Sequence, residues 1–137
     1  MRTDQIAAAT TCVNAAHDGS LSFPEIVARL SAAGFESYVV DYRQHQQTFF
    51  LPDGEAATLP MVAKATAGNS RVAALFDAPE MARLVRWAQT NPADYSYAAF
   101  SQKAKSAGCA GYMVSFLGRR VVYFGRTAET HVELFPQ

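Results

Sequence analysis

Residues Leu21–Ile26 have the sequence Leu-Ser-Phe-Pro-Glu-Ile, which contains several signals that start a helix. The hydroxyl of Ser22 can accept the backbone N–H of Glu25, and the Glu25 carboxylate can reach back to the N–H of Ser22, which is a capping box. A proline lies in the first turn, where a helix needs no N–H. Apolar residues then follow at helical spacing up to Gly34, a residue type that commonly ends helices. The sequence therefore predicts a helix over residues 23–33.

The same arrangement recurs at Phe76–Met81, where Asp77 is the predicted cap and Glu80 its predicted partner in a second capping box. The apolar residues that follow keep helical spacing until Asn91, which precedes a proline. A further helical stretch is expected around residues 61–67. We therefore expect residues 61–91 to form a largely helical connection.

Several other segments show the period of two that is typical of strands. From Tyr38 to Tyr42, alternate aromatic and aliphatic side chains share one face, and Asp41 lies on the other. Gly118 and Arg119 separate two later apolar runs and favour a tight turn with glycine at its first central position. The expected strands cover residues 38–42, 48–51, 111–117, 120–124 and 130–135.

The two halves of the chain resemble one another. Ser22–Glu55 aligns without a gap with Ser96–Glu129, and seven of the aligned pairs are identical. The helix cap, the core spacing, the Ala-Gly helix end and the aromatic strand coincide in this register. A unit of one helix and a meander of antiparallel strands cannot bury its sheet face alone. We therefore predict one α+β domain over residues 1–137, internally duplicated, with the two helix-plus-strand units packed about a pseudo-twofold axis.

Length and composition limit the functional classes. Half of the 137 residues are hydrophobic, and 12 basic residues balance 12 acidic ones. This neutrality argues against a nucleic-acid interface, and no apolar run reaches the length of a membrane span. Cys12 and Cys109 lack the spacing of a zinc site, and we expect Cys109 to be a small buried side chain. No nucleotide, metal or catalytic motif is present, so we expect no cofactor or metal. Because no membrane span is expected, we predict a soluble, cytoplasmic protein.

Landmarks of both halves resemble a known family. They are the Ala33-Gly34 and Ala107-Gly108 helix ends with the tyrosines that follow, and the closing segment Val132–Pro136. In these residues the chain resembles a small family of bacterial and prophage proteins sometimes labelled phage envelope protein-like, over about residues 21–136. The family has no known function, so the resemblance implies a prophage-related origin and no activity. The chain departs from the family pattern at Ser115, where an acidic residue is usual, and at residues 126–128, where a turn with glycine is usual.

Four residues are candidates for catalysis. His131 and Glu133 are two residues apart, so a strand places both on one face, and a histidine held by a carboxylate is the minimal acid–base pair. Asp41, next to Tyr42, becomes a candidate acid if it lies in a cleft. The favoured interpretation of Asp41 is a solvated or paired carboxylate, and that of His131 with Glu133 is a cross-strand polar pair.

Three arginines are candidates for binding an anion, because guanidinium groups suit phosphate and carboxylate. They are Arg119 and Arg120 at the predicted hairpin turn, together with Arg126. Solvated arginines are also common in turns, and this is the favoured interpretation. The aromatic residues of the strands resemble stacking platforms, but at strand period most of them belong in the core.

The sequence therefore favours a non-catalytic binding or self-association module of prophage-related origin, with a homodimer or a protein partner expected. The alternative is a small enzyme, or a binder of a small anionic ligand, with a cleft between the two repeats. Geometry separates the two interpretations. For an enzyme, Asp41, Tyr42, His131 and Glu133 must converge on one point.

Overall fold

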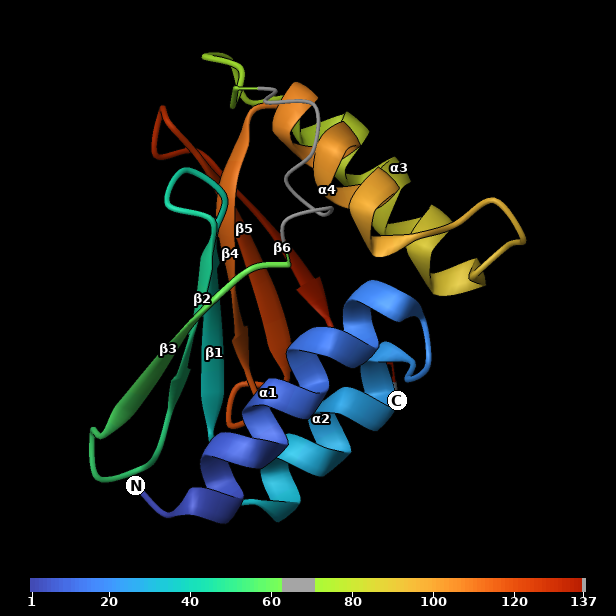
Figure 1. Cartoon of the computed structure of the whole chain (residues 1–137). Coiled ribbons are helices and arrows are strands. Elements are labelled where there is room, and N and C mark those ends of the chain that lie inside the picture. Colours follow the sequence, from blue (N-terminus) through green and yellow to red (C-terminus); the bar gives the residue numbers. More distant parts are fainter. Residues whose placement is uncertain (63–70, 137) are drawn as a thin grey trace.

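A six-stranded antiparallel sheet with helices on one face makes up the fold (Figure 1). The computed structural model describes residues 1–62 and 71–136. Within these residues four helices lie on the same face of the sheet, in two pairs, α1 with α2 and α3 with α4 (Figure 1). The predicted α+β class is confirmed. The helices are α1 (Thr3–Asp18), α2 (Phe23–Ala32), α3 (Ala78–Thr90) and α4 (Tyr97–Ser106).

The helix starts follow the capping signals of the sequence only in part. At α2 the capping box is confirmed, because the Ser22 hydroxyl accepts the N–H of Glu25 and the Glu25 carboxylate accepts the N–H of Ser22 at 2.9 Å. At α3 the Asp77 carboxylate accepts the N–H of Glu80 at 3.1 Å. The Glu80 carboxylate, however, pairs with Arg83 at 2.8 Å. The predicted second capping box is therefore wrong, since the guanidinium one turn away holds this carboxylate.

The strands agree with the predicted segments except at two places. Ala56–Pro60 forms a strand that the sequence did not predict, because it lacks the large alternating side chains of the others. The predicted two-residue turn at Gly118 is wrong. Residues 116–119 form a four-residue loop, and its left-handed residue is Arg119, with φ of 51°. The strands are β1 (Ser37–Asp41), β2 (Gln46–Phe50), β3 (Ala56–Pro60), β4 (Cys109–Ser115), β5 (Arg120–Gly125) and β6 (Thr130–Leu134).

The strand order is β3-β2-β1-β4-β5-β6, so β1 and β4 meet at the centre and β3 and β6 form the edges. Every neighbouring pair is antiparallel. At the centre Val39 lies opposite Met113. The two halves of the chain therefore contribute three adjacent strands each to one continuous sheet.

The core lies between the sheet and the helices. Tyr38 and Val40 of β1, and Tyr42 just after it, are at most 6% exposed and face the helices, as the period of two predicted. Cys109 is fully buried, also as predicted, and its burial raises the pKa of the thiol to about 12. The helical stretch expected around residues 61–67 lies, from residue 63 on, outside the described residues, and residues 61–62 are not helical.

Candidate functional site

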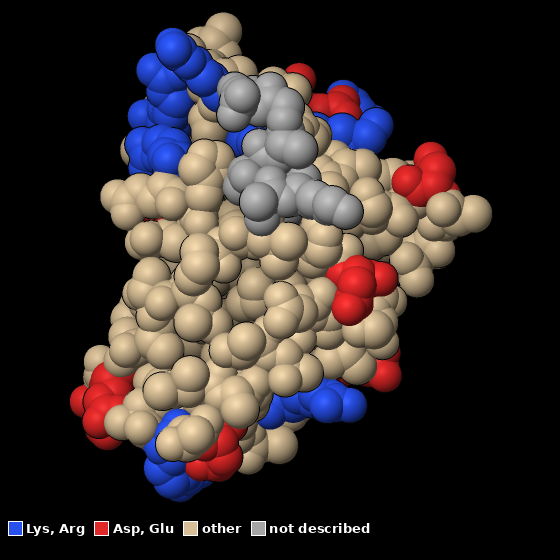
Figure 2. Space-filling view, viewed as in Figure 1, with Lys and Arg blue, Asp and Glu red and all other residues tan. Residues whose placement is uncertain are grey.

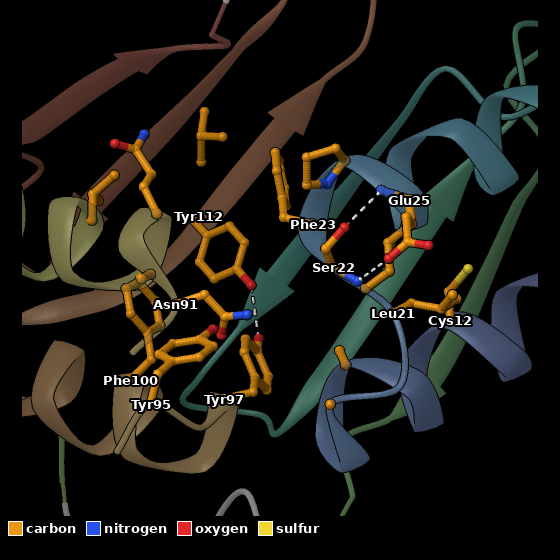
Figure 3. Close-up of a pocket in the computed structure, with 18 of the residues that line it drawn as sticks. Cys12, Leu21, Ser22, Phe23, Glu25, Asn91, Tyr95, Tyr97, Phe100 and Tyr112 are labelled. Atoms are coloured by element: carbon orange, nitrogen blue, oxygen red, sulfur yellow. Dashed lines mark hydrogen bonds between the residues drawn. The ribbon is translucent and has the colours of Figure 1, made fainter. Parts of the chain in front are cut away.

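A cavity of about 620 Å³ lies over the middle of the sheet, between the two helix pairs. Its floor is formed by strands from both halves of the chain, including β1, β2, β4 and β5. One wall comes from the end of α1 and the start of α2, and the other from the end of α3 and the start of α4. Figure 3 shows Leu21, Ser22 and Phe23 on one side, with Tyr95, Tyr97 and Tyr112 facing them from the other.

Aromatic and aliphatic side chains dominate this lining. At the start of α2 they are Leu21, Phe23 and Ile26, which carry no polar atoms, whereas at the start of α4 they are Tyr95, Tyr97 and Phe100, two of which carry a phenol. On the strands, Tyr38 of the first half and Tyr112 and Tyr123 of the second half also line the cavity.

Only some of the polar groups in the cavity have partners within the protein. The hydroxyls of Tyr97 and Tyr112 are hydrogen-bonded at 2.7 Å, and they point at one another in Figure 3. The hydroxyls of Tyr38 and Tyr123 and the amide of Gln47 line the cavity without a hydrogen-bond partner among the described residues, but their polar atoms are not closed off from solvent. The buried side-chain polar atom that lacks a partner among the described residues is Nδ1 of His17, which also lines the cavity. Because buried polar groups are nearly always paired, these groups offer hydrogen bonds to an occupant of the cavity.

Burial keeps the phenols of this site neutral. Desolvation raises the pKa of Tyr97 to about 12, although its hydrogen bonds to Tyr112, Ser101 and Tyr42 act in the opposite direction. Desolvation also raises the pKa of Tyr38 and of Tyr112 well above the ordinary value. At physiological pH these hydroxyls therefore donate and accept hydrogen bonds, but none of them supplies a negative charge or a strong base.

The formal charges at the cavity are acidic. No lysine or arginine occurs among the described residues that line it, whereas Asp18, Glu25 and Glu133 do. Figure 2, in the view of Figure 1, shows basic side chains gathered toward the upper and lower ends of the molecule and none in the middle. Asp18 and Glu25 are exposed and accept backbone N–H groups of Ser20 and Ser22. Glu133, on β6, is the half-buried carboxylate of the three.

The four candidate catalytic residues do not converge. Asp41 faces the side of the sheet away from the helices and accepts the N–H groups of Arg43 and Gln44 at 2.9 and 3.1 Å. Tyr42 is buried on the helix face and accepts a hydrogen bond from Ser101 at 3.2 Å. Neither lines the cavity.

The structure does bring the other two candidates together. The Nε2 of His131 lies 2.8 Å from a carboxylate oxygen of Glu133, so both side chains share one face of β6, as predicted. Of the four candidates, Glu133 is the one that lines the cavity.

The three candidate arginines do not share one site. Arg119 lies over the ring of Phe135, 5.6 Å from its centre. The Nε of Arg120 donates to the carbonyl of Gly118, and Arg126, beyond the other end of β5, donates to the carbonyl of Val72. These arrangements fix the hairpin and a neighbouring loop.

Sequence reasoning missed most of the residues that give the cavity its chemistry. Gln47 was the available signal, because it is a polar residue at a core-facing position of a strand, where an apolar side chain is expected. Tyr95 and Tyr97 gave no such signal, since they flank a helix start.

Two comparisons with known proteins found no match. No protein-family model matches the chain, and no curated protein matches it significantly. The resemblance to phage envelope protein-like sequences therefore stays a prediction. Among the described helices, none is long and apolar enough to span a membrane. Within residues 1–62 and 71–136, no three His, Cys, Asp or Glu side chains gather as metal ligands would. The fold and the cavity define an α+β domain with a cavity between its two helix pairs.

Proposed function

We propose that this chain is a non-catalytic binding module that holds a small organic molecule in the cavity between its two halves. The observation that carries the proposal is the set of polar groups that line the cavity without a partner among the described residues, on Tyr38, Gln47 and Tyr123, together with the buried Nδ1 of His17. The volume of about 620 Å³ is that of a site for a small organic ligand. The phenols are neutral and the candidate catalytic residues are dispersed, which favours binding over catalysis.

The proposal includes an internal duplication of an ααβββ unit about a pseudo-twofold axis. The strand registers support it. Val39 lies opposite Met113, which is its own counterpart in the alignment of the two halves, so a twofold axis through this pair relates them. The pairings of the remaining strands also correspond when the two halves are aligned. Tyr38 pairs with Phe49 as Tyr112 pairs with Tyr123, and Gln46 pairs with Pro60 as Arg120 pairs with Leu134.

The backbone supports the same relation. Within residues 22–55 and 96–129, each left-handed residue of the first unit aligns with a left-handed residue of the second, although two of the three pairs differ in residue type. A shared backbone with different side chains is what duplication followed by divergence produces. The pairs are Gly34 and Gly108 with φ of 103° and 89°, His45 and Arg119 with 56° and 51°, and Gly54 and Ala128 with 94° and 67°.

Equivalent positions of the two units meet at the cavity. At a site on a pseudo-twofold axis each unit contributes an equivalent wall, and neither unit fills the space between the two walls. The matched lining pairs include Ser22 with Ser96, Ile26 with Phe100, and Tyr38 with Tyr112.

Native mass spectrometry of gently purified protein, combined with a cavity-filling variant, tests the proposal. Val121 lines the cavity, whereas its neighbour Val122 faces the open side of the sheet. We expect the wild-type chain and Val122→Trp to carry an extra mass that denaturation removes, and Val121→Trp to be bare. A wild-type chain that carries no mass, and that no compound of a diverse small-molecule library stabilises against heat, overturns the proposal.

Self-association is a second candidate function, and the open face of the sheet favours it. Met113 and Val132 are 41% and 44% exposed there, and among the described residues β3 and β6 present unpaired edges to which a second copy can add. Sedimentation equilibrium tests this: we expect a dimer that Val132→Lys dissociates, and a wild-type monomer at every concentration contradicts it. The prophage-related origin stays part of the proposal, and the genes that neighbour the coding gene test it.

A further inference from the structure

The two walls of the cavity differ in polarity although they occupy equivalent positions. At three matched pairs the first unit has an apolar side chain, and the second unit has a tyrosine at the aligned position. An occupant of such a cavity has an apolar side and a hydrogen-bonding side, and it binds in one orientation. The three pairs are Leu21 with Tyr95, Phe23 with Tyr97, and Phe49 with Tyr123, whereas a fourth lining pair, Gln47 with Val121, has its polar side chain in the first unit.

The charge at the polar side comes from Glu133. It lies directly opposite Val121, next to Tyr123, on the helix face of the sheet. Its Oε2 contacts Nε2 of His131 at 2.8 Å, and its Oε1 has no partner among the described residues. Because the carboxylate is only partly exposed, water screens its field less than it screens a surface charge.

The rest of the lining favours the same sign of ligand charge. No lysine or arginine among the described lining residues is available to hold an anion, and the other carboxylates, Asp18 and Glu25, add to the negative potential. His17, at the end of α1, also lines the first wall, and its Nδ1 is buried without a partner among the described residues. The faces of tyrosine and phenylalanine rings attract a cation through their quadrupoles. A carboxylate or phosphate ligand finds the positive ends of α2 and α4, whose N-caps Ser22 and Ser96 line the cavity, but no cationic side chain of the lysine or arginine type among the described lining residues.

We propose that the cavity binds a small organic amine. Its apolar body packs against Leu21, Phe23 and Phe49, and its protonated nitrogen lies at the phenolic wall within reach of Glu133. This inference rests on the proposed function, because it names the ligand class of the same cavity.

Three probes of equal length and different charge test the ligand class. We choose phenylbutylamine, phenylbutanol and phenylbutyrate, and measure their binding to the full chain by isothermal titration calorimetry at neutral pH. We expect the amine to bind about tenfold more tightly than the alcohol, which corresponds to one charge-assisted hydrogen bond. The carboxylate is expected to bind most weakly. This order tests the inference on the wild-type chain without any variant.

Two matched variants then locate the charge. Glu133→Gln keeps the shape of the side chain and is expected to reduce amine affinity to that of the alcohol, with alcohol binding unchanged. Glu129→Gln removes an exposed carboxylate of the same half that does not line the cavity, and is expected to leave all three affinities unchanged.

The outcomes separate this inference from the proposed function. Equal binding of amine and alcohol, unaffected by Glu133→Gln, overturns the amine assignment and leaves the cavity as a binding site. Tightest binding of phenylbutyrate also overturns it, in favour of an anionic ligand. If none of the three probes binds, or if Val121→Trp leaves their binding unchanged, the amine assignment fails, and the proposed function is then decided separately by the native mass spectrum and the library screen.

Discussion

At the scale of single residues, Gly34 and Gly108 show that aligned positions of the two halves can differ in how strictly they require glycine. Both follow a helix with a left-handed backbone, at φ of 103° and 89°. A Cβ at residue 34 would have its closest contact with the side chain of Gln5, at 3.2 Å, whereas one at residue 108 would lie 2.0 Å from the carbonyl oxygen of Leu75. Residue 34 therefore needs only a residue that tolerates a positive φ, whereas residue 108 also needs the absence of a Cβ, because the backbone of Leu75 lies so close.

We therefore predict that alanine substitutions at these two glycines differ in cost. Gly34→Ala is expected to lower the free energy of unfolding by about 1 kcal/mol, the cost of a left-handed alanine. Gly108→Ala is expected to lower it by about 3 kcal/mol, since the backbone near Leu75 must also move. Urea unfolding followed by circular dichroism measures both. Equal costs would show that the close approach at Gly108 is absent.

The tyrosines of the cavity give a second prediction at this scale. Tyr112 is hydrogen-bonded to Tyr97, so Tyr112→Phe removes one buried hydrogen bond and is expected to destabilise the chain by about 1 kcal/mol. Tyr123 has no such partner among the described residues, so Tyr123→Phe is expected to leave the stability of the ligand-free chain unchanged within about 0.5 kcal/mol. Thermal unfolding of the two variants, with ligand removed, makes the comparison. A large loss in Tyr123→Phe would mean that its hydroxyl is already paired.

At the scale of elements, the start of α2 is fixed by local chemistry. The capping box at Ser22 satisfies two N–H groups that the helix itself cannot satisfy. We predict that Ser22→Ala lowers the free energy of unfolding by about 1 kcal/mol. Ser31→Ala, on the exposed side of the same helix, is the control and is expected to be neutral or slightly stabilising. A neutral Ser22→Ala in chemical denaturation would place the helix start elsewhere.

Local signals also explain which elements the sequence could predict. The start of α2 and strand β1 follow from residues close in sequence, so both were predicted. Strand β3 was missed because Ala56–Pro60 is held in place by pairing with β2, which no local pattern encodes. The prediction of a second capping box was wrong for a similar reason. Whether the Glu80 carboxylate accepts a backbone N–H or pairs with Arg83 depends on side-chain geometry, which the local sequence does not encode.

At the scale of the whole molecule, the candidate site was harder to predict than the fold. The alignment of Ser22 with Ser96 is visible in the sequence and led to the predicted two-unit architecture, which stays a proposal. The cavity is lined by both halves of the chain, so its lining combines residues that are far apart in the sequence. Of that lining, sequence reasoning selected Glu133, because its spacing from His131 is local, and did not select Gln47 or the tyrosines of the second wall.

Nuclear magnetic resonance of chain with isotope-labelled tyrosine rings tests the central claim most directly, because the chain has only six tyrosines. Spectra are recorded with and without phenylbutylamine and phenylbutanol. The account predicts that the rings of Tyr97, Tyr112 and Tyr123 shift and show nuclear Overhauser contacts to the bound probe, and that Val121→Trp abolishes both effects. Contacts that arise instead from the open face of the sheet, or shifts that Val121→Trp leaves intact, would contradict it.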